Sequence, residues 1–292
     1  MIIDAHHHIW LQRDLPWLMG PMQPRIFGPY ESIRRDYLID EYRDDLAGTG
    51  VGKSVYVQAN WAPQHFESEV AWVQKTADQS GWPHGIVGYA DFLQPDVRPH
   101  LDRLANYPLM RGVRMQLHWH ENELYRFAAQ PDLATDPVLQ RNVSYLADYD
   151  WAFDLQVFSG QMTGAAKLAK ACPNVTFILQ HAGMPEDLSA TGLAEWKANL
   201  AQLAEAPNVV SKLSGFGTFI HRNDASHIKR IINGTVAIFG AERCLFGSNF
   251  PIEKLWTTYS ELIAAFQSAA ADLPATSRQA IFRDTAARVY RI

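Results

Sequence analysis

The sequence predicts a single (β/α)8 barrel of the TIM type with a closing helix at the C-terminus, and three observations lead to this α/β fold class. Short β-branched or aromatic runs alternate with longer helical stretches along the chain, which is the pattern of parallel βαβ units. Eight such runs are present, the number that closes a barrel. No Gly/Ser-rich linker or change in composition divides the 292 residues, so we expect one domain over residues 1–292.

Each predicted strand is short and apolar enough to be buried on both faces of a parallel sheet. In chain order the strands cover residues 2–6, 54–58, 85–89, 112–116, 152–158, 175–180, 209–213 and 244–248. Helical stretches separate most of them, for instance residues 67–80, 137–149, 163–172 and 193–206. Apolar residues at Ile281, Ala286, Val289 and Tyr290 predict the closing helix over residues 277–290.

The segment from Leu11 to Tyr37 is too long and irregular for an ordinary strand-to-helix connection. On a barrel it would lie over the C-terminal ends of the strands, where active sites are found. Two interpretations are open, a loop that encloses a substrate and a structural wrap across the barrel.

Composition and charge exclude several classes of protein. A formal net charge of −5 with both signs interspersed offers no basic stripe for nucleic acid and no polybasic membrane anchor. No signal-like segment precedes the first strand, and no apolar run is long enough to span a bilayer. Two separated cysteines, Cys172 and Cys244, favour buried thiols in a cytoplasmic protein over a disulfide framework. We expect a small-molecule substrate as the partner.

The first ten residues, MIIDAHHHIW, contain the strongest functional signal. Side chains alternate across a strand, so His6 and His8 should project from the same face at the end of the first strand. A purification tag would not need the apolar residues that flank this run of histidines. The spacing therefore predicts two imidazoles aimed at one point.

Two other strand ends carry polar residues that a barrel would bring to the same face. The sixth strand ends in LQHAG at 179–183, which contains His181, and the eighth ends in GSNFP at 247–251, which contains Asn249. In a closed parallel barrel the C-terminal strand ends converge. His6, His8, His181 and Asn249 are thus the candidate catalytic residues.

These motifs resemble the amidohydrolase superfamily over the whole length of the chain. The resemblance rests on DAHHHIW at 4–10 with PWL at 16–18, GVR at 112–114, HAG at 181–183 and KLSG at 212–215. The branch it resembles most contains sugar-acid lactonases and the lactonase that acts on pyrone dicarboxylate. The resemblance implies that His6, His8 and His181 line the reaction centre. The superfamily usually has an aspartate base on strand 8, where this chain has Asn249, and an amide is not a base at neutral pH.

The resemblance leaves the metal content open. Binuclear members take further ligands from strands 4 and 5, where this chain has Arg114, Gln116 and Gln156, none of which is a usual metal ligand. Three neutral imidazoles could hold one divalent ion such as Zn²⁺ and lower the pKa of its bound water. The alternative is a metal-independent site in which His181 and its neighbours transfer the protons.

Other polar residues near strand ends are candidates for substrate binding. Arg114 could bind a substrate carboxylate or lactone oxygen with its bidentate fork, or form an ion pair with Asp4 or Asp154, and Lys212 has the same two interpretations. Gln58, Asn60 and Trp61 follow the second strand and suit a polyhydroxylated ring. Gln116, Gln156, His118 and His120 complete the predicted substrate-binding set. Glu253 is either a substitute base for the missing aspartate or a solvated residue.

The function favoured by the residues and the resemblance is hydrolysis of a cyclic ester of a sugar acid or carboxylated lactone. One alternative is a metal-dependent, non-oxidative decarboxylase of the same superfamily. The other is a barrel that only binds its ligand, because Asn249 replaces the expected base.

Overall fold

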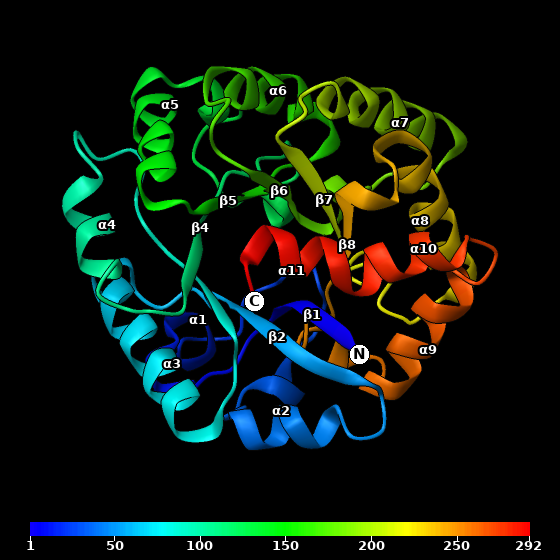
Figure 1. Cartoon of the computed structure of the whole chain (residues 1–292), viewed down its shortest axis with the longest axis horizontal. Helices are drawn as coiled ribbons and strands as arrows, with labels where there is room; N and C mark the ends of the chain where they lie inside the picture. Colours follow the sequence, from blue (N-terminus) through cyan, green and yellow to red (C-terminus); the bar gives the residue numbers. More distant parts are fainter.

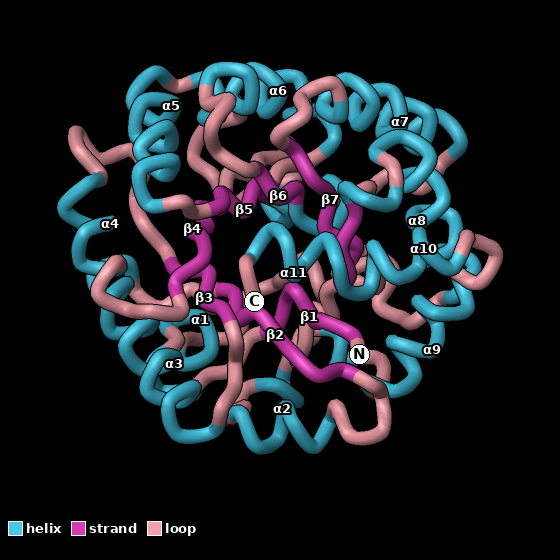
Figure 2. The backbone as a smooth tube through the Cα atoms, viewed as in Figure 1, coloured by secondary structure: helices cyan, strands magenta, loops and turns pink.

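The computed structural model describes residues 1–292, and its eight strands form one parallel sheet in sequential order β1 to β8. The strands are β1 (Ile2–His7), β2 (Val51–Val57), β3 (Gly85–Gly88), β4 (Met110–Gln116), β5 (Ala152–Gln156), β6 (Phe177–Leu179), β7 (Val209–Leu213) and β8 (Cys244–Phe246). They surround a common axis, as Figure 2 shows in magenta. All eight strands lie at the predicted places, with bounds that differ by a few residues.

Residues just beyond β8 close the sheet against β1. The backbone N–H of Asn249 donates to the His6 carbonyl over 2.7 Å, and the N–H of His8 donates to the Phe250 carbonyl over 2.7 Å. His7 and Phe250 form a parallel bridge. The predicted (β/α)8 barrel is therefore confirmed.

Helices surround the strands on the outside of the barrel (Figure 1). The outer helices are α2 (Ile39–Asp45), α3 (Phe66–Ser80), α4 (Arg98–Leu104), α5 (Pro137–Ser144), α6 (Met162–Ala171), α7 (Ala190–Ala204), α8 (Ala225–Phe239), α9 (Tyr259–Ala269) and α10 (Ala275–Gln279). Two more helices lie at the ends of the barrel: α1 (Pro16–Met19) over the C-terminal ends of the strands and α11 (Thr285–Tyr290) across the N-terminal end. None of them is long and apolar enough to cross a membrane.

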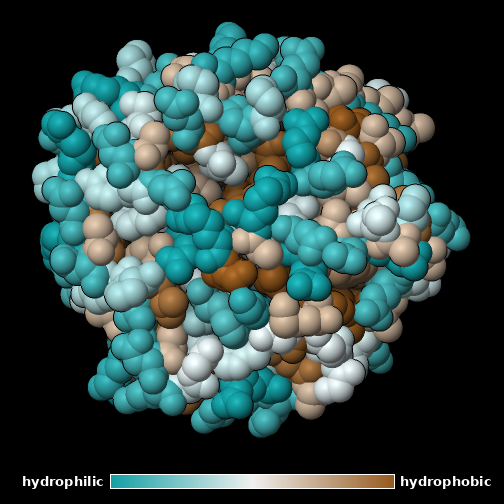
Figure 3. All heavy atoms as spheres, in the orientation of Figure 1, coloured by the Kyte–Doolittle hydropathy of each residue, from teal (hydrophilic) through white to brown (hydrophobic).

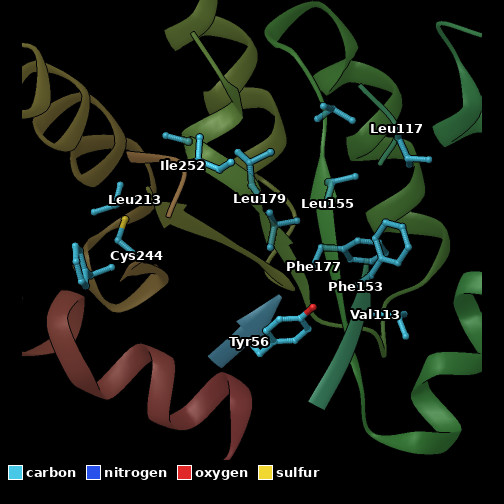
Figure 4. Packing of buried hydrophobic residues seen from close by; sticks show 14 of the residues in the cluster. Tyr56, Val113, Leu117, Phe153, Leu155, Phe177, Leu179, Leu213, Cys244 and Ile252 are labelled. Carbon is cyan, nitrogen blue, oxygen red and sulfur yellow. The ribbon is translucent and has the colours of Figure 1, made fainter. Parts of the chain in front are cut away.

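The largest apolar cluster lies between the strands and the surrounding helices. Side chains such as Val113, Phe153 and Phe177 leave their strands outward and pack together, as Figure 4 shows. Helix α3 illustrates how the helices join this layer, because its buried residues Val70 and Val73 lie on one face. Burying such side chains is the main favourable term in folding.

A second, smaller cluster fills the barrel interior at its N-terminal end. It joins Ile3 and Ala5 of β1 to Ala286, Val289 and Tyr290 of α11. Figure 1 shows α11 across the middle of this end, close to both termini. The predicted closing helix is present, but it is divided into α10, a π-helical turn (Ala280–Asp284) and α11. On this face hydrophilic residues predominate, with apolar residues visible in smaller patches (Figure 3).

An irregularity in β1 determines which way its histidines point. Between Asp4 and His7 the pairing with β2 advances by three residues on β1 but only two on β2, which defines a β-bulge. Ala5 belongs to the interior cluster, whereas Asp4 is bonded by the hydroxyls of Tyr42 and Tyr259 on the outer helices. Asp4 is therefore outside the barrel, while His6, two residues on, approaches the interior His181.

The chain from residue 11 to residue 37 crosses the C-terminal end of the barrel and is tied down by main-chain oxygens. The Trp17 indole donates to the Ala59 carbonyl over 3.0 Å. Within the loop, the Arg34 guanidinium donates to the carbonyls of Leu18 and Gly20 at 3.0 and 2.9 Å. This loop is thus both a structural cover and, through the residues described below, one wall of a cavity.

Candidate active site

A cavity of about 570 Å³ opens at the C-terminal ends of the strands. The size is ordinary for a small-molecule site. Its polar lining consists of His8, Arg25, Gln58, Asn60, Arg114, Gln116, His118, Gln156, His181, Thr218 and Asn249. Its large apolar lining side chains are Trp10, Trp17, Ile26, Phe27, Trp61, Tyr89, Phe127, Met184, Phe219 and Ile252. The site is therefore a polar group of strand-end residues beside an aromatic wall.

Three imidazoles from two distant strands meet here. The ring centroid of His6 lies 5.0 Å from that of His8 and 4.9 Å from that of His181. His8 and His181 line the cavity, whereas His6 is fully buried behind them and both of its ring nitrogens lack a hydrogen-bond partner. The structure thus brings together the three histidines that the sequence selected.

Left-handed backbone conformations end two of the contributing strands and present their side chains. His181 has φ +53° and Asn249 has φ +59°, a region that costs a residue other than glycine about 1–3 kcal/mol. These turns explain why β6 and β8 are shorter than predicted. Gly215 leaves room for the His181 ring, because a Cβ there would lie 2.5 Å from His181 Nδ1. Left-handed backbone at residues other than glycine, as at His181 and Asn249, is typical of functional sites.

Hydrogen bonds fix the histidine rings. His8 Nδ1 is 2.7 Å from the carbonyl oxygen of Val57, and because a carbonyl only accepts, that nitrogen carries the proton. His8 Nε2 therefore has a free lone pair. His181 Nδ1 is 2.8 Å from the Ser214 hydroxyl, which leaves Nε2 as the nitrogen available to a ligand. Sequence reasoning had not selected Ser214 as a site residue.

The electrostatic environment keeps these rings neutral. Burial, followed by the positive charge of Arg114, lowers the pKa of His8 and of His181 to about 3. Burial and Lys212 likewise hold the pKa of His6 well below its usual range. At neutral pH all three rings are consequently uncharged and can accept hydrogen bonds.

Arg114 is the cation of the cavity. Its side chain is buried, Nη2 donates to the Gln58 carbonyl over 2.5 Å, and Nε has no partner. It forms no ion pair with Asp4 or Asp154, because Asp4 lies outside the barrel and Asp154 is paired with Lys212 at 2.7 Å. Burial lowers the pKa of Arg114 to about 10, so the group remains charged at neutral pH. A buried guanidinium without an acidic partner favours an anionic ligand.

The predicted amide and indole residues also lie on the cavity. Gln58 Oε1 accepts the N–H of Asn60 over 2.7 Å, while Gln58 Nε2 is buried without a partner. The Gln156 oxygen and the Trp61 indole nitrogen are likewise unpartnered, and Gln116 lines the same wall. Unpaired buried donors and acceptors are costly, so they indicate a hydroxylated ligand or ordered water.

The two histidines after β4 differ in position. His118 lines the cavity, stacks on Phe127 at 5.3 Å between ring centroids, and has a pKa lowered to about 3 by burial. His120 does not line the cavity; its Nδ1 accepts the N–H of Asn122, and its Nε2 is 3.7 Å from Glu186. The alternation that orients side chains on a strand ends before this loop.

Glu253 differs from the solvated residue that was one sequence expectation. Its side chain is 1 % exposed and lies beside Asn249. Its Oε2 accepts the indole N–H of Trp256 over 2.8 Å. Burial raises the pKa of Glu253 to about 8, against the opposing effect of its contacts with Trp256 and Asn249.

Several cavity residues were not selected individually from the sequence. Phe127 and Phe219 are in irregular loops, where spacing says nothing about direction. Tyr89 ends the predicted third strand, so its position at the strand end was a signal that could have been used. Arg25 and Phe27 belong to the covering loop that the sequence analysis singled out as a whole.

A closed parallel barrel with unpartnered polar groups at the C-terminal strand ends has the architecture of TIM-barrel enzymes. The chain belongs to the amidohydrolase family, whose model matches residues 3–292. It is 34 % identical over 293 residues to the uncharacterized protein y4mH of Sinorhizobium fredii, covering 100 % of this chain and 98 % of that one. It is 30 % identical over 305 residues to an L-fucono-1,5-lactonase of Burkholderia multivorans, covering 99 % and 96 % of the two chains.

A solved structure shares the fold closely. An amidohydrolase from Burkholderia multivorans with bound zinc superimposes with a TM-score of 0.83 at 29 % identity, covering 100 % of this chain and 99 % of that one. The relatives agree with the family and the lactonase branch that the motifs predicted.

The donor atoms of the three histidines suit zinc, but their arrangement and surroundings do not. No group of three or more His, Cys, Asp or Glu side chains is arranged to hold a metal ion. The unpaired positive charge of Arg114, which lowers the pKa of His6, would also oppose a divalent cation. The predicted ligand set His6, His8 and His181 therefore does not form a metal site as it stands, and no step below is routed through a metal.

Proposed function

We propose that this protein is a lactonase that adds water to the carbonyl of a cyclic ester of a sugar acid or carboxylated lactone. The observation that carries the proposal is the pair of neutral imidazoles, His8 and His181, facing one cavity with the unpaired cation Arg114. Acceptors beside a fixed positive charge are what hydrolysis of an ester needs, because a proton leaves the water as negative charge develops on the carbonyl oxygen.

His181 serves as the general base in this scheme. Its Nδ1 is held by Ser214, so its Nε2 can take a proton from the attacking water. The hydroxide adds to the carbonyl carbon, and the ring oxygen leaves with the proton that the imidazolium returns. Arg114 donates hydrogen bonds to the oxyanion or to a substrate carboxylate.

His8 has a different task. Because its Nδ1 proton is donated to Val57, the neutral ring presents only an acceptor at Nε2. It cannot donate to an oxyanion, so it accepts a hydrogen bond from the water or from a substrate hydroxyl. His6, which touches both rings but not the cavity, supports their positions.

The amides and the indole provide the binding surface. Gln58, Asn60, Gln116 and Gln156 supply donors and acceptors for ring hydroxyls, and Trp61 supplies an apolar face with one N–H. His118 contributes from the β4 side of the cavity, and His120 has no direct part from its present position. Similarity to an L-fucono-1,5-lactonase supports sugar-acid 1,5-lactones as the first substrates to try.

A panel of sugar-acid and dicarboxylate lactones tests the proposal. Ring opening releases an acid, so a pH indicator follows it directly. His181→Asn should lower kcat by at least about 10²-fold, the usual contribution of a general base. His84→Asn is the matched control, since His84 is on the connection into β3 and bonds the backbone of Ser54 away from the cavity. No hydrolysis of any lactone by the parent protein, or equal rates in His181→Asn, would refute the assignment.

A further inference from the structure

A carboxyl group is buried directly behind the amide of Asn249. Glu253 begins the 3-10 turn Glu253–Leu255, and its backbone N–H donates to the Asn249 carbonyl over 3.3 Å. One carboxyl oxygen, Oε2, accepts from the Trp256 indole, and the other, Oε1, is buried without a geometrically good partner. Burying an ionisable group this deeply is costly, so an apolar residue would serve packing better.

The Glu253 and Trp256 side chains pack closely against a glycine. Gly217, on the loop after β7, faces the pair: a Cβ there would lie 2.2 Å from Trp256 Nε1 and 2.6 Å from Glu253 Oε2. The Trp256 indole, Gly217 and the Asn249 amide therefore all adjoin the Glu253 carboxyl.

No charged side chain on the adjoining elements forms an ion pair with the Glu253 carboxyl. Lys254 is turned to Glu41 and Asp45 of α2, at 2.8 and 2.7 Å. His221, from the loop after β7, lies with its ring 6.0 Å from the Trp256 ring and bonds the Ile26 carbonyl. Glu31, on the turn Glu31–Ile33 of the covering loop, is exposed.

The chemistry of the two groups links them. An amide has an oxygen that accepts and a nitrogen that donates, and Asn249 both lines the cavity and contacts the Glu253 carboxyl. An ionised Glu253 can only accept, so it binds the amide nitrogen and leaves the oxygen for the cavity. A protonated Glu253, with Oε2 engaged by Trp256, donates from Oε1 to the amide oxygen and turns the nitrogen inward.

We propose that Glu253 is a positioning residue that determines which end of the Asn249 amide faces the cavity. With Glu253 ionised, Asn249 Oδ1 accepts a hydrogen bond from the attacking water and orients it toward the carbonyl. Asn249 and Glu253 together thereby orient the water as a carboxylate on strand 8 would, but they do not accept its proton. The catalytic consequence rests on the proposed lactonase function, whereas the link between the two side chains does not.

Three variants separate this role from a structural one. In Glu253→Gln the only oxygen is required by Trp256, so the new amide nitrogen must donate to Asn249 Oδ1 and the wrong end faces the cavity. We expect kcat of this variant to fall at least tenfold, with KM within threefold of the parent value. In the parent protein kcat should rise with pH as Glu253 ionises, and in the variant this rise should disappear. In Trp256→Phe/Glu253→Gln that oxygen is free for the Asn249 nitrogen, so kcat should recover severalfold. Trp256→Phe alone is the matched control.

Unchanged kcat and pH profile in Glu253→Gln, or a double variant slower than both single variants, would overturn the proposal. A measurement on the parent protein keeps it testable if the variants do not fold. The side-chain ¹⁵N amide resonance of Asn249, assigned by its loss in Asn249→Asp, should shift with one titration between pH 6 and 10. A resonance that stays constant overturns the link, and one that shifts in a protein with no lactonase activity refutes only the proposed function.

Discussion

Lys212 on β7 and Asp154 on β5 form an ion pair across the barrel interior, with Nζ 2.7 Å from Oδ2 and both side chains fully buried. Tyr290 of the closing helix α11 donates to Asp154 Oδ1 over 3.1 Å, and Gln180 donates to Oδ2 over 2.6 Å. Asp154 thus compensates the charge of Lys212, whereas Arg114 is left without an acidic partner. This difference indicates a structural role for Lys212 and supports the proposed ligand-binding role of Arg114.

Removing one member of the buried pair should destabilise the protein strongly. In Asp154→Asn the Lys212 ammonium loses its anionic partner, which we expect to cost about 3–5 kcal/mol of unfolding free energy. The double variant Asp154→Asn/Lys212→Met removes both charges and should recover much of that loss. Urea denaturation of the three proteins measures the effect. Equal stability of Asp154→Asn and the parent would show that the pair has no structural importance.

Replacing Arg114 should affect turnover more than folding. Arg114→Met removes the donor proposed for the oxyanion and should reduce kcat/KM by about 10²–10³-fold. Arg114→Lys keeps the charge but loses the planar fork, so we expect an intermediate rate. Steady-state kinetics with one lactone compares all three. If Arg114→Lys and Arg114→Met lose nothing, the guanidinium does not contact the reacting group.

Asn249→Asp distinguishes an enzyme from a barrel that only binds a ligand. The new carboxylate would lie beside buried Glu253, and two carboxyl groups that share a site cannot both ionise easily. We expect at least a tenfold loss of kcat at neutral pH. A large gain of activity would indicate instead that Asn249 replaced a base in a site that had lost its activity.

Stability should fall in acid, in part because of His118. Burial lowers the pKa of His118 from an ordinary 6.5 to about 3. Between these pH values the unfolded chain binds a proton that the native protein does not, so stability falls as the pH decreases. The slope is about 1.4 kcal/mol per pH unit for each such group. His118→Gln should show a shallower decline between pH 6.5 and 4 by about this amount, measured by urea denaturation. Parallel curves for the two proteins would contradict this explanation.

The order of strands and the convergence of His6, His8 and His181 could be predicted because they depend on local periodicity and on barrel closure. The bulge in β1 could not, because it arises from pairing with β2 and places His6 on the opposite face from Asp4. Burial of Glu253 depends on Gly217 and Trp256, which local patterning does not link to it. His120 was grouped with His118 in the predicted substrate-binding set, but the loop after β4 directs it toward Glu186.

The most direct test of the account is the rate of lactone ring opening after exhaustive removal of metal by chelation. We propose that neutral His181, beside Arg114, activates water without a metal ion. The metal-depleted protein should keep kcat/KM within about twofold of its initial value, a change of well below 1 kcal/mol in activation free energy. Added Zn²⁺ should not increase it. Loss of activity on chelation that returns when Zn²⁺ is restored would contradict the account and assign activation of the water to a metal.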